Sequence, residues 1–226
     1  MTAQALTLAD MKPEQDKAED SRRFWDRTAR KYAKGKISDQ ASYDKSLART
    51  RDYFAKDSDV VEIGGGTGTT ALLHAPFVKH ITGTDISSEM VAIAREKTAE
   101  SGPLNADFIA AVADDLPFAN ASFDVAMAHN LYHLVEDVDA ALREAHRILK
   151  PGGVFITKTP ALGDMNPFIK WVVLPVMQRI YGITTLHKFT KDEWQQALAR
   201  AGFTIDAVEY HDKGGENGRA FIVARK

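Results

Sequence analysis

The sequence predicts an α/β fold in which a largely parallel β-sheet carries helices on both faces. Two observations lead to this prediction. From residue 59 onward, short apolar runs alternate with longer segments of helical periodicity, the pattern of repeated strand–helix units. The first run, 60–63, is followed at once by the glycines 64–66, as expected where a buried strand turns tightly into a helix. The 226 residues suffice for one domain with a sizeable core, assigned to 21–226.

The segment before the first strand is predicted to form a helical cap. Residues 1–20 are polar and are expected to be a flexible terminus. Residues 21–56 are expected to contain two helices, over 22–34 and 42–55, separated near Gly35. One face of the first helix gathers Phe24, Trp25, Thr28 and Tyr32. That face must cover something apolar, either the sheet or a bound ligand.

The alternating elements follow from periodicity and turn residues. Strands are expected over 59–63, 80–84, 107–111, 123–128, 153–159, 203–210 and 219–225. Helices are expected over 68–75, 87–100, 137–149 and 190–201. The third of these has a single apolar stripe, and the last begins with a capping box of Thr190 and Glu193. A glycine-rich turn at Gly214 and Gly215 predicts that the final two strands form a hairpin.

Residues 160–189 depart from this alternation and are predicted to be an insertion. Proline and glycine interrupt it at Pro160, Gly163, Pro167, Pro175 and Gly182. Its middle is apolar, but the stretch 168–181 contains Lys170 and Arg179 and is too short to span a bilayer.

Composition narrows the class of protein. The formal net charge is −2 with acidic and basic residues interspersed, so nucleic acid is not an expected partner. The chain contains no cysteine, which excludes disulfides and a cysteine nucleophile, and no metal site is expected. The first 20 residues lack the basic start and apolar core of a secretory signal. A cytoplasmic enzyme is the resulting expectation.

The glycine loop and a later carboxylate predict a ligand that carries a ribose. Free amides in such a loop can approach a ligand closely. Asp85 lies 21 residues after Gly64, at the end of the second predicted strand, where a carboxylate can accept hydrogen bonds from ribose hydroxyls. The dinucleotide fingerprint Gly-x-Gly-x-x-Gly fails at its third position, Thr69. The glycines fall instead at 64, 66 and 68, after Glu62.

This Glu-x-Gly-x-Gly-x-Gly arrangement resembles class I S-adenosylmethionine-dependent methyltransferases, specifically small-molecule enzymes of the UbiE-like, type 11 kind. Three later segments resemble the same family in the same order: 114–125 with its Leu-Pro-Phe and Ser-Phe-Asp, 145–153 with its Arg-x-Leu-Lys-Pro-Gly-Gly, and 201–203 with Ala-Gly-Phe. The resemblance covers about 60–226. It implies a Rossmann-like, seven-stranded methyltransferase sheet whose last strand is antiparallel.

The resemblance also implies the cofactor S-adenosylmethionine, with S-adenosylhomocysteine as product, and assigns residues to it. Asp85 would accept hydrogen bonds from the ribose, and Ile86 would pack on the adenine. The carboxylate that relatives place at the adenine amino group is missing here, because Val112 and Ala113 stand at those positions. The implied cofactor residues are Glu62, Gly64, Gly65, Gly66, Gly68, Asp85, Ile86, Ala113, Asp114 and His129.

The methyl is expected to pass by direct in-line displacement, so positioning supplies most of the acceleration and a base is optional. Catalytic candidates are His129, His133 and Tyr32. Tyr43 is a second candidate for the cap, and His187 is a weaker candidate base. For His133, packing at a helix start is favoured over the base role, whereas for His129 a structural role and the base role are equally expected. In similar enzymes an insertion like 160–189 shapes the substrate pocket, which would give the acceptor apolar bulk; a homodimer contact or local packing is the alternative.

Three functional hypotheses follow. The first is a methyltransferase acting on a small molecule, the second a lipid or quinone methyltransferase, and the third a non-catalytic cofactor-binding protein of the same fold. An oxidoreductase that uses NAD is disfavoured by Thr69 and by the turn at 150–153.

Overall fold

The computed structural model describes residues 8–101, 105–215 and 218–226. It contains the predicted seven-stranded sheet with strand order β3-β2-β1-β4-β5-β7-β6. β7 is antiparallel to both of its neighbours, β5 and β6, whereas the other pairs are parallel. The strands are β1 (Asp59–Ile63), β2 (His80–Asp85), β3 (Ala106–Ala110), β4 (Phe123–His129), β5 (Leu149–Thr159), β6 (Thr204–Tyr210) and β7 (Ala220–Arg225).

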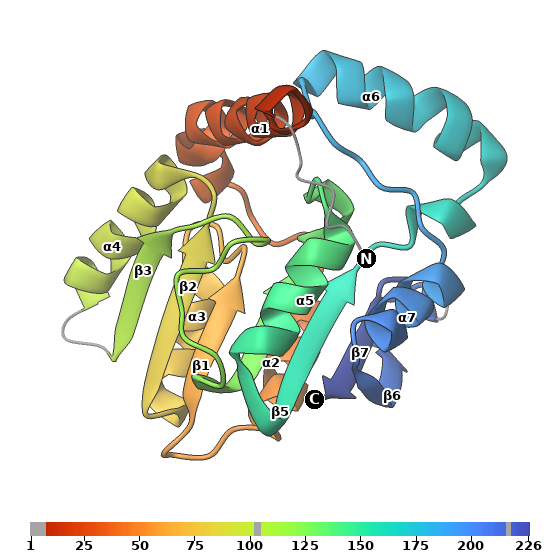
Figure 1. Cartoon of the computed structure of the whole chain (residues 1–226). Helices are drawn as coiled ribbons and strands as arrows, with labels where there is room; N and C mark the ends of the chain where they lie inside the picture. Colours follow the sequence, from red (N-terminus) through yellow and green to blue (C-terminus); the bar gives the residue numbers. More distant parts are fainter. Residues whose placement is uncertain (1–7, 102–104, 216–217) are drawn as a thin grey trace.

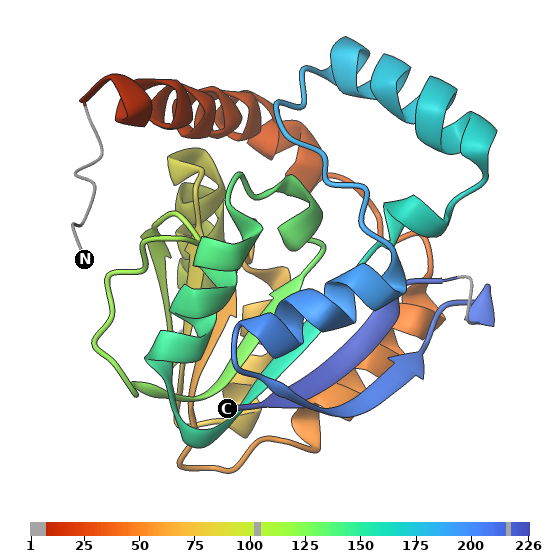
Figure 2. The ribbon, with the colours of Figure 1, turned by 45° about the vertical axis from the view of Figure 1, so that its right-hand side comes forward.

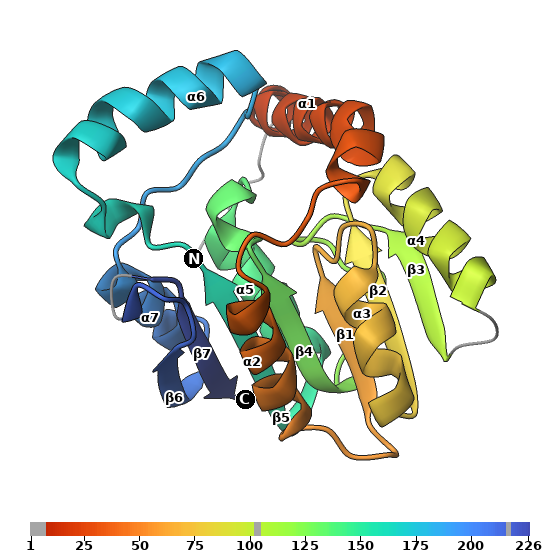
Figure 3. The same cartoon turned by 180° about the vertical axis from the view of Figure 1, so that it is seen from behind.

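Helices cover both faces of the sheet (Figures 1 and 3). The helices are α1 (Leu8–Ala33), α2 (Gln40–Arg51), α3 (Thr69–His74), α4 (Ser88–Ser101), α5 (Val138–Ile148), α6 (Leu174–Tyr181) and α7 (Lys191–Arg200). Short helical turns are η1 (Ala75–Phe77), η2 (Tyr132–Leu134), η3 (Leu162–Asp164) and the π-helical η4 (Ile169–Val173). α5 and α7 lie on one face, seen in Figure 2, and α2, α3 and α4 on the other.

Two apolar clusters, one on each face, hold these layers together. On the first face Leu142 and Leu198, from α5 and α7, pack against Phe155 of β5. On the second face Val91 of α4 packs against Ile81 and the other strand residues of that side. All five of these side chains are at most 3% exposed. Burial on both faces explains why the central strands read as continuous apolar runs in the sequence.

The start of α1 differs from the prediction. The helix begins at Leu8 rather than near residue 22, so residues 8–20, expected to be a flexible terminus, are helical; residues 1–7 lie outside the described part. The segment is polar, but glutamate, lysine and alanine favour a helix, and Glu19 pairs with both Arg22 and Arg23 at helical spacing. α1 crosses above the carboxyl ends of the strands (Figure 1).

The apolar face of α1 packs mainly on α4 rather than on the sheet. Ala29 is fully buried and lies in a small cluster with Met90 and Ile93, which Trp25 joins. Polar contacts fix the same pair: Asp26 accepts hydrogen bonds from the Ser87 hydroxyl and the Glu89 amide. α1 is therefore held by the helix that follows β2.

The insertion is more regular than predicted. Residues 167–181 form one helical stretch in which the π-turn η4 runs directly into α6. Pro175 lies inside this stretch, close to the change from π-helical to α-helical hydrogen bonding. The predicted breaks at Pro160, Gly163 and Gly182 do fall outside this stretch.

Candidate active site

The glycine loop leads from β1 into α3 and is hydrogen-bonded to the end of β2. Gly64 and Gly66 have φ angles of 67° and 55°, which a side chain adopts only with strain. The Gly65 amide donates to the Thr84 carbonyl at 2.8 Å, and the Gly66 amide donates to Asp85 Oδ2 at 2.9 Å. A Cβ on Gly66 would meet nothing nearer than Tyr32 Cε1 at 3.9 Å, so this part of the loop borders open space.

The Asp85 carboxylate is held by the backbone on both sides. Its Oδ1 accepts from the Ser87 amide and its Oδ2 from Gly66, each at 2.9 Å. Burial outweighs these hydrogen bonds and raises the pKa of Asp85 to about 6. Each oxygen retains a lone pair, so an oriented carboxylate near pH 7 can accept further hydrogen bonds from a ligand.

A cleft of about 140 Å³ lies between α1 and the carboxyl ends of β1, β2 and β4. It is lined by eight of the predicted residues: Tyr32, Gly64, Gly66, Asp85, Ile86, Ala113, Asp114 and His129. Trp25 and Met90 add apolar walls. The Asp85 carboxylate, the free space beside the loop and the apolar walls together suit an adenosine-sized ligand.

A second cavity of about 700 Å³ adjoins this cleft and shares part of its wall. The shared residues are Trp25, Tyr32, Gly64, Gly66, His129 and Asn130. Glu62, Gly65 and Tyr43 line only the second cavity, together with Ser42, Lys158 and Arg219. Among the described residues, none from 160–189 lines either cavity. The cap, not the insertion, surrounds the space beside the cleft.

His129 stands at the junction of the two cavities. Its Nδ1 lies 3.8 Å from Glu62 Oε1, close enough for electrostatic attraction but too far for a hydrogen bond. Within the described part of the chain, His129 Nε2 and Glu62 Oε2 are buried without a hydrogen-bond partner. Unsatisfied buried polar atoms are costly, and here they indicate a place where a polar ligand belongs.

Three predicted residues are not brought to the cavities. His133 lines neither cavity, and burial lowers its pKa to about 4. His187 is engaged elsewhere, with its Nε2 at 2.7 Å from the Val135 carbonyl oxygen. Gly68 caps α3 with φ 75°, and a Cβ there would lie 2.7 Å from Ala94 and Phe108. Gly68 therefore serves helix packing against the sheet.

Some residues that line the two cavities were not predicted from the sequence. Asn130 has a positive φ of 55° directly after β4, a conformation that asparagine tolerates better than most residues. Asn130 could have been predicted from the sequence, because it directly follows a strand whose carboxyl end lies at the site. Lys158 gave no such signal, because a lysine inside a strand is usually solvent-facing. Here the Lys158 side chain is only 7% exposed.

Lys158 is held by a buried polar network behind the second cavity. Its Nζ lies 2.8 Å from Asp212 Oδ1 and 2.9 Å from Ser42 Oγ on α2. Asp212 also accepts from the Arg219 amide and Nε. Burial opposes ionisation of Asp212, but hydrogen bonds from Lys158 and Ser42 hold its pKa well below the usual range.

The variant Asp212→Ala is expected to lower the free energy of unfolding by about 2 kcal/mol, because it leaves the Lys158 charge buried with hydroxyl partners only. Urea denaturation measures this. The double variant Asp212→Ala/Lys158→Met is the matched control and should lose less than the single variant. If the single and double variants are equally destabilised, the ion pair does not contribute as described.

The strand order with an antiparallel β7, the glycine loop and the carboxylate after β2 define a class I S-adenosylmethionine-dependent methyltransferase. Comparison with known proteins agrees. Residues 61–157 match the family model described as a methyltransferase domain. The chain belongs to the class I S-adenosylmethionine-dependent methyltransferase family.

Two curated relatives illustrate the similarity. The uncharacterized methyltransferase YcgJ of Bacillus subtilis is 39% identical over 68% of this chain and 58% of its own length. The ubiquinone/menaquinone biosynthesis C-methyltransferase UbiE of Bartonella quintana is 32% identical over 69% of this chain and 67% of its own length. Among solved structures, an S-adenosylmethionine-dependent methyltransferase from Mesorhizobium loti has the same fold, with a TM-score of 0.69, 24% identity, and coverage of 83% of this chain and 99% of that one.

Proposed function

We propose that the protein transfers a methyl group from S-adenosylmethionine to a small molecule held in the second cavity. The shared wall of the two cavities supports this most strongly, because donor and acceptor must meet across a single boundary for direct transfer. Gly64, Gly66 and His129 are part of that boundary.

Residues of the cleft suit the cofactor. Asp85 would accept hydrogen bonds from the ribose hydroxyls, and Ile86 and Ala113 would pack beside the adenine, with Asp114 near its edge. The space beside Gly66 would admit the methionine end. When bound, S-adenosylmethionine supplies a methyl group already activated by a positive sulfur.

His129 would act as the base for an acceptor that loses a proton. Its unpartnered Nε2 can accept that proton, and Glu62, 3.8 Å from Nδ1, would stabilise the resulting positive imidazole. Tyr32 lines both cavities from α1 and would close over the reacting atoms.

The proposal is tested by incubating the protein with methyl-labelled S-adenosylmethionine and a panel of small molecules that carry hydroxyl, amine, thiol or activated carbon groups. Label is expected in the small-molecule fraction. His129→Ala should slow transfer by about 100-fold or more while S-adenosylhomocysteine affinity changes much less, because the cofactor contact implied for His129 is its backbone carbonyl. His133→Asn is the matched control, because His133 lines neither cavity. If the wild type and His129→Ala transfer the methyl group at the same rate, His129 does not act as the base.

A lipid or quinone methyltransferase is the second candidate. The apolar insertion favours it, as does the similarity to a relative named for ubiquinone and menaquinone biosynthesis. Cofactor binding without transfer to any acceptor would instead support the non-catalytic alternative. A cytoplasmic location and a homodimer stay predictions.

A further inference from the structure

The insertion helix, residues 167–181, turns its apolar side chains outward. Eight large apolar residues of this region are exposed: Met165, Phe168, Ile169, Trp171, Val172, Val176, Met177 and Ile180. Phe168, Trp171 and Ile180 are 64, 66 and 71% exposed. None of the side chains described between 167 and 180 is buried. A contiguous apolar surface of this kind marks an interaction site.

Four of these exposed residues form a stripe along one side of the helix. Phe168, Val172, Val176 and Ile180 follow at intervals of four residues, which places them along a single stripe. We call the eight exposed residues the apolar face. Lys170 and Lys188 lie near the Trp171 ring, with Nζ 5.7 and 5.1 Å from its centroid. An aromatic ring beside cations is typical of a protein surface at the boundary of lipid and water.

The insertion itself carries charge of one sign, although Asp164, Asp192 and Glu193 flank it. Residues 165–191 contain four basic side chains and no carboxylate: Lys170, Arg179, Lys188 and Lys191. Lys170, Arg179 and Lys188 make no salt bridge with any residue in the described ranges. Glu193 attracts Lys170 and offsets part of its charge, whereas Arg179 and Lys188 remain available to attract an acidic surface.

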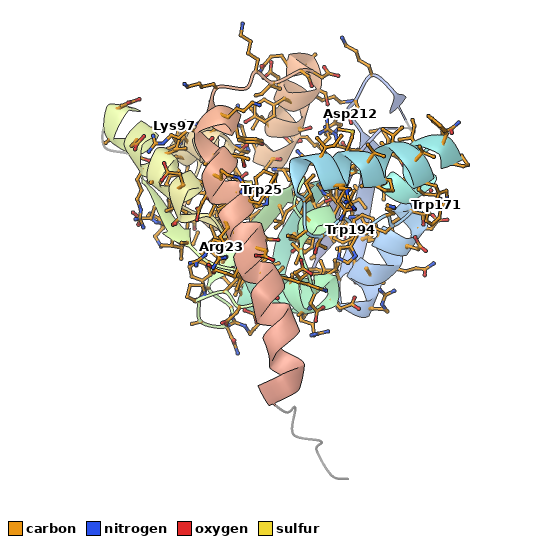
Figure 4. The ribbon with its side chains drawn as sticks, turned by 90° about the horizontal axis from the view of Figure 1, so that it is seen from above. Arg23, Trp25, Lys97, Trp171, Trp194 and Asp212 are labelled. Atoms are coloured by element: carbon orange, nitrogen blue, oxygen red, sulfur yellow. The ribbon has the colours of Figure 1, made fainter. Side chains whose placement is uncertain are left out.

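The neighbouring helix α1 extends this positive surface. Ser21 of α1 shares a hydrogen bond with Thr184, and Gly182 at the end of α6 lies against Phe24 and Arg27. Arg27 and Lys31 follow at helical spacing on α1, Lys34 lies in the turn directly after it, and all three are exposed. Figure 4 looks down on this side of the molecule, where Trp171 extends from the end of the insertion helix that is remote from α1.

We propose that the apolar face docks on a bilayer surface that contains anionic lipids. The apolar side chains would enter the interface, and the basic residues of the insertion and of α1 would contact the headgroups. A second copy of the chain fits less well, because an isologous contact would bring the same basic residues of both copies together. No helix among the described residues could span a membrane, so the contact is peripheral.

Docking would place α1, which walls both cavities, close to the bilayer. A lipid-soluble acceptor could then reach the second cavity without crossing open water. This link to acceptor supply rests on the proposed function, whereas the docking itself does not.

The test is sedimentation of the full chain with vesicles of phosphatidylcholine alone or of phosphatidylcholine with phosphatidylglycerol. We expect binding to the acidic vesicles only, and weaker binding when salt shortens the Debye length from about 10 Å to about 3 Å. The double variant Trp171→Ser/Ile180→Ser should lower vesicle partitioning at least about tenfold. Leu73→Ser is the matched control, because Leu73 is 42% exposed on α3 and should leave partitioning unchanged.

Two further measurements separate the outcomes. Calorimetry with S-adenosylhomocysteine is run on the same preparations, and unchanged affinity in the double variant shows that its cleft is intact. If the wild-type protein binds S-adenosylhomocysteine but does not sediment with the acidic vesicles, the docking proposal is wrong and the proposed function is unaffected. If the wild-type protein does not bind S-adenosylhomocysteine, the proposed function is wrong. A wild-type dimer that the double variant dissociates in sedimentation equilibrium would overturn the bilayer in favour of a second copy.

Discussion

Replacing Gly66 by valine is expected to remove measurable binding of S-adenosylhomocysteine while the protein stays folded. A Cβ at this position meets no protein atom nearer than 3.9 Å, so a side chain would occupy the space of the cleft itself. The φ of 55° adds strain of about 1–2 kcal/mol, a tolerable cost to folding. Calorimetry measures the affinity, which should fall by at least about 1,000-fold, and thermal denaturation measures the stability.

Gly152→Val is the matched control for this variant. Gly152 also has a positive φ, 77°, and open space around it, but it lies in the turn at the start of β5 and lines neither cavity. It should incur similar strain and bind S-adenosylhomocysteine normally. Normal binding by Gly66→Val would show that the loop does not face the cofactor.

Asp85 is expected to make cofactor affinity depend on pH. Its carboxylate has a pKa of about 6, against about 3.9 for an unfolded aspartate. Ribose hydroxyls donate to the ionised form, so affinity for S-adenosylhomocysteine should be highest above about pH 6 and fall as the pH drops through that value. Asp85→Asn should bind about 10- to 100-fold more weakly at pH 8 and lose most of this dependence.

Asp85 also makes the stability of the protein depend on pH, but in the opposite direction: stability falls as the pH rises, whereas cofactor affinity increases. Because its pKa is raised in the folded protein, Asp85 favours the folded state below about pH 4, and this contribution is lost as the pH rises through about 6. Thermal denaturation without ligand measures the effect against Asp85→Asn, in which it should be absent. A cofactor affinity that is flat from pH 5 to pH 8 in the wild type would contradict the ribose role of Asp85.

The sheet could be predicted from the sequence because each strand carries its own signal. Strands β1 and β4 are apolar runs bounded by turn residues, and their bounds agree with the prediction within one residue. The glycine-rich turn predicted the antiparallel pairing of β6 with β7, whereas the family resemblance implied that the last strand is antiparallel to the rest of the sheet. The beginning of α1 was missed because polar helices give no apolar stripe to detect.

The site was only partly predictable, for a different reason. Glycines 64 and 66 and Asp85 lie beside strand ends, where the topology fixes what they face. His133 is only four residues from His129, yet the turn η2 directs it away from both cavities. The acceptor space depends on how α1 and α2 lie over the sheet, and helix placement of this kind leaves no local mark in the sequence. The prediction that residues 160–189 shape the substrate pocket was based on their apolar content, but none of the described residues of this segment lines either cavity.

The anchoring of α1 has a consequence for the order of events during turnover. Asp26 of α1 and Asp85 both hydrogen-bond to Ser87, one through its hydroxyl and the other through its amide. Whatever occupies the ribose end of the cleft therefore also restrains the helix that walls the neighbouring cavity. Filling one compartment should tighten the other by the same factor in either direction. Such reciprocity predicts that cofactor and acceptor bind cooperatively, whichever of the two binds first.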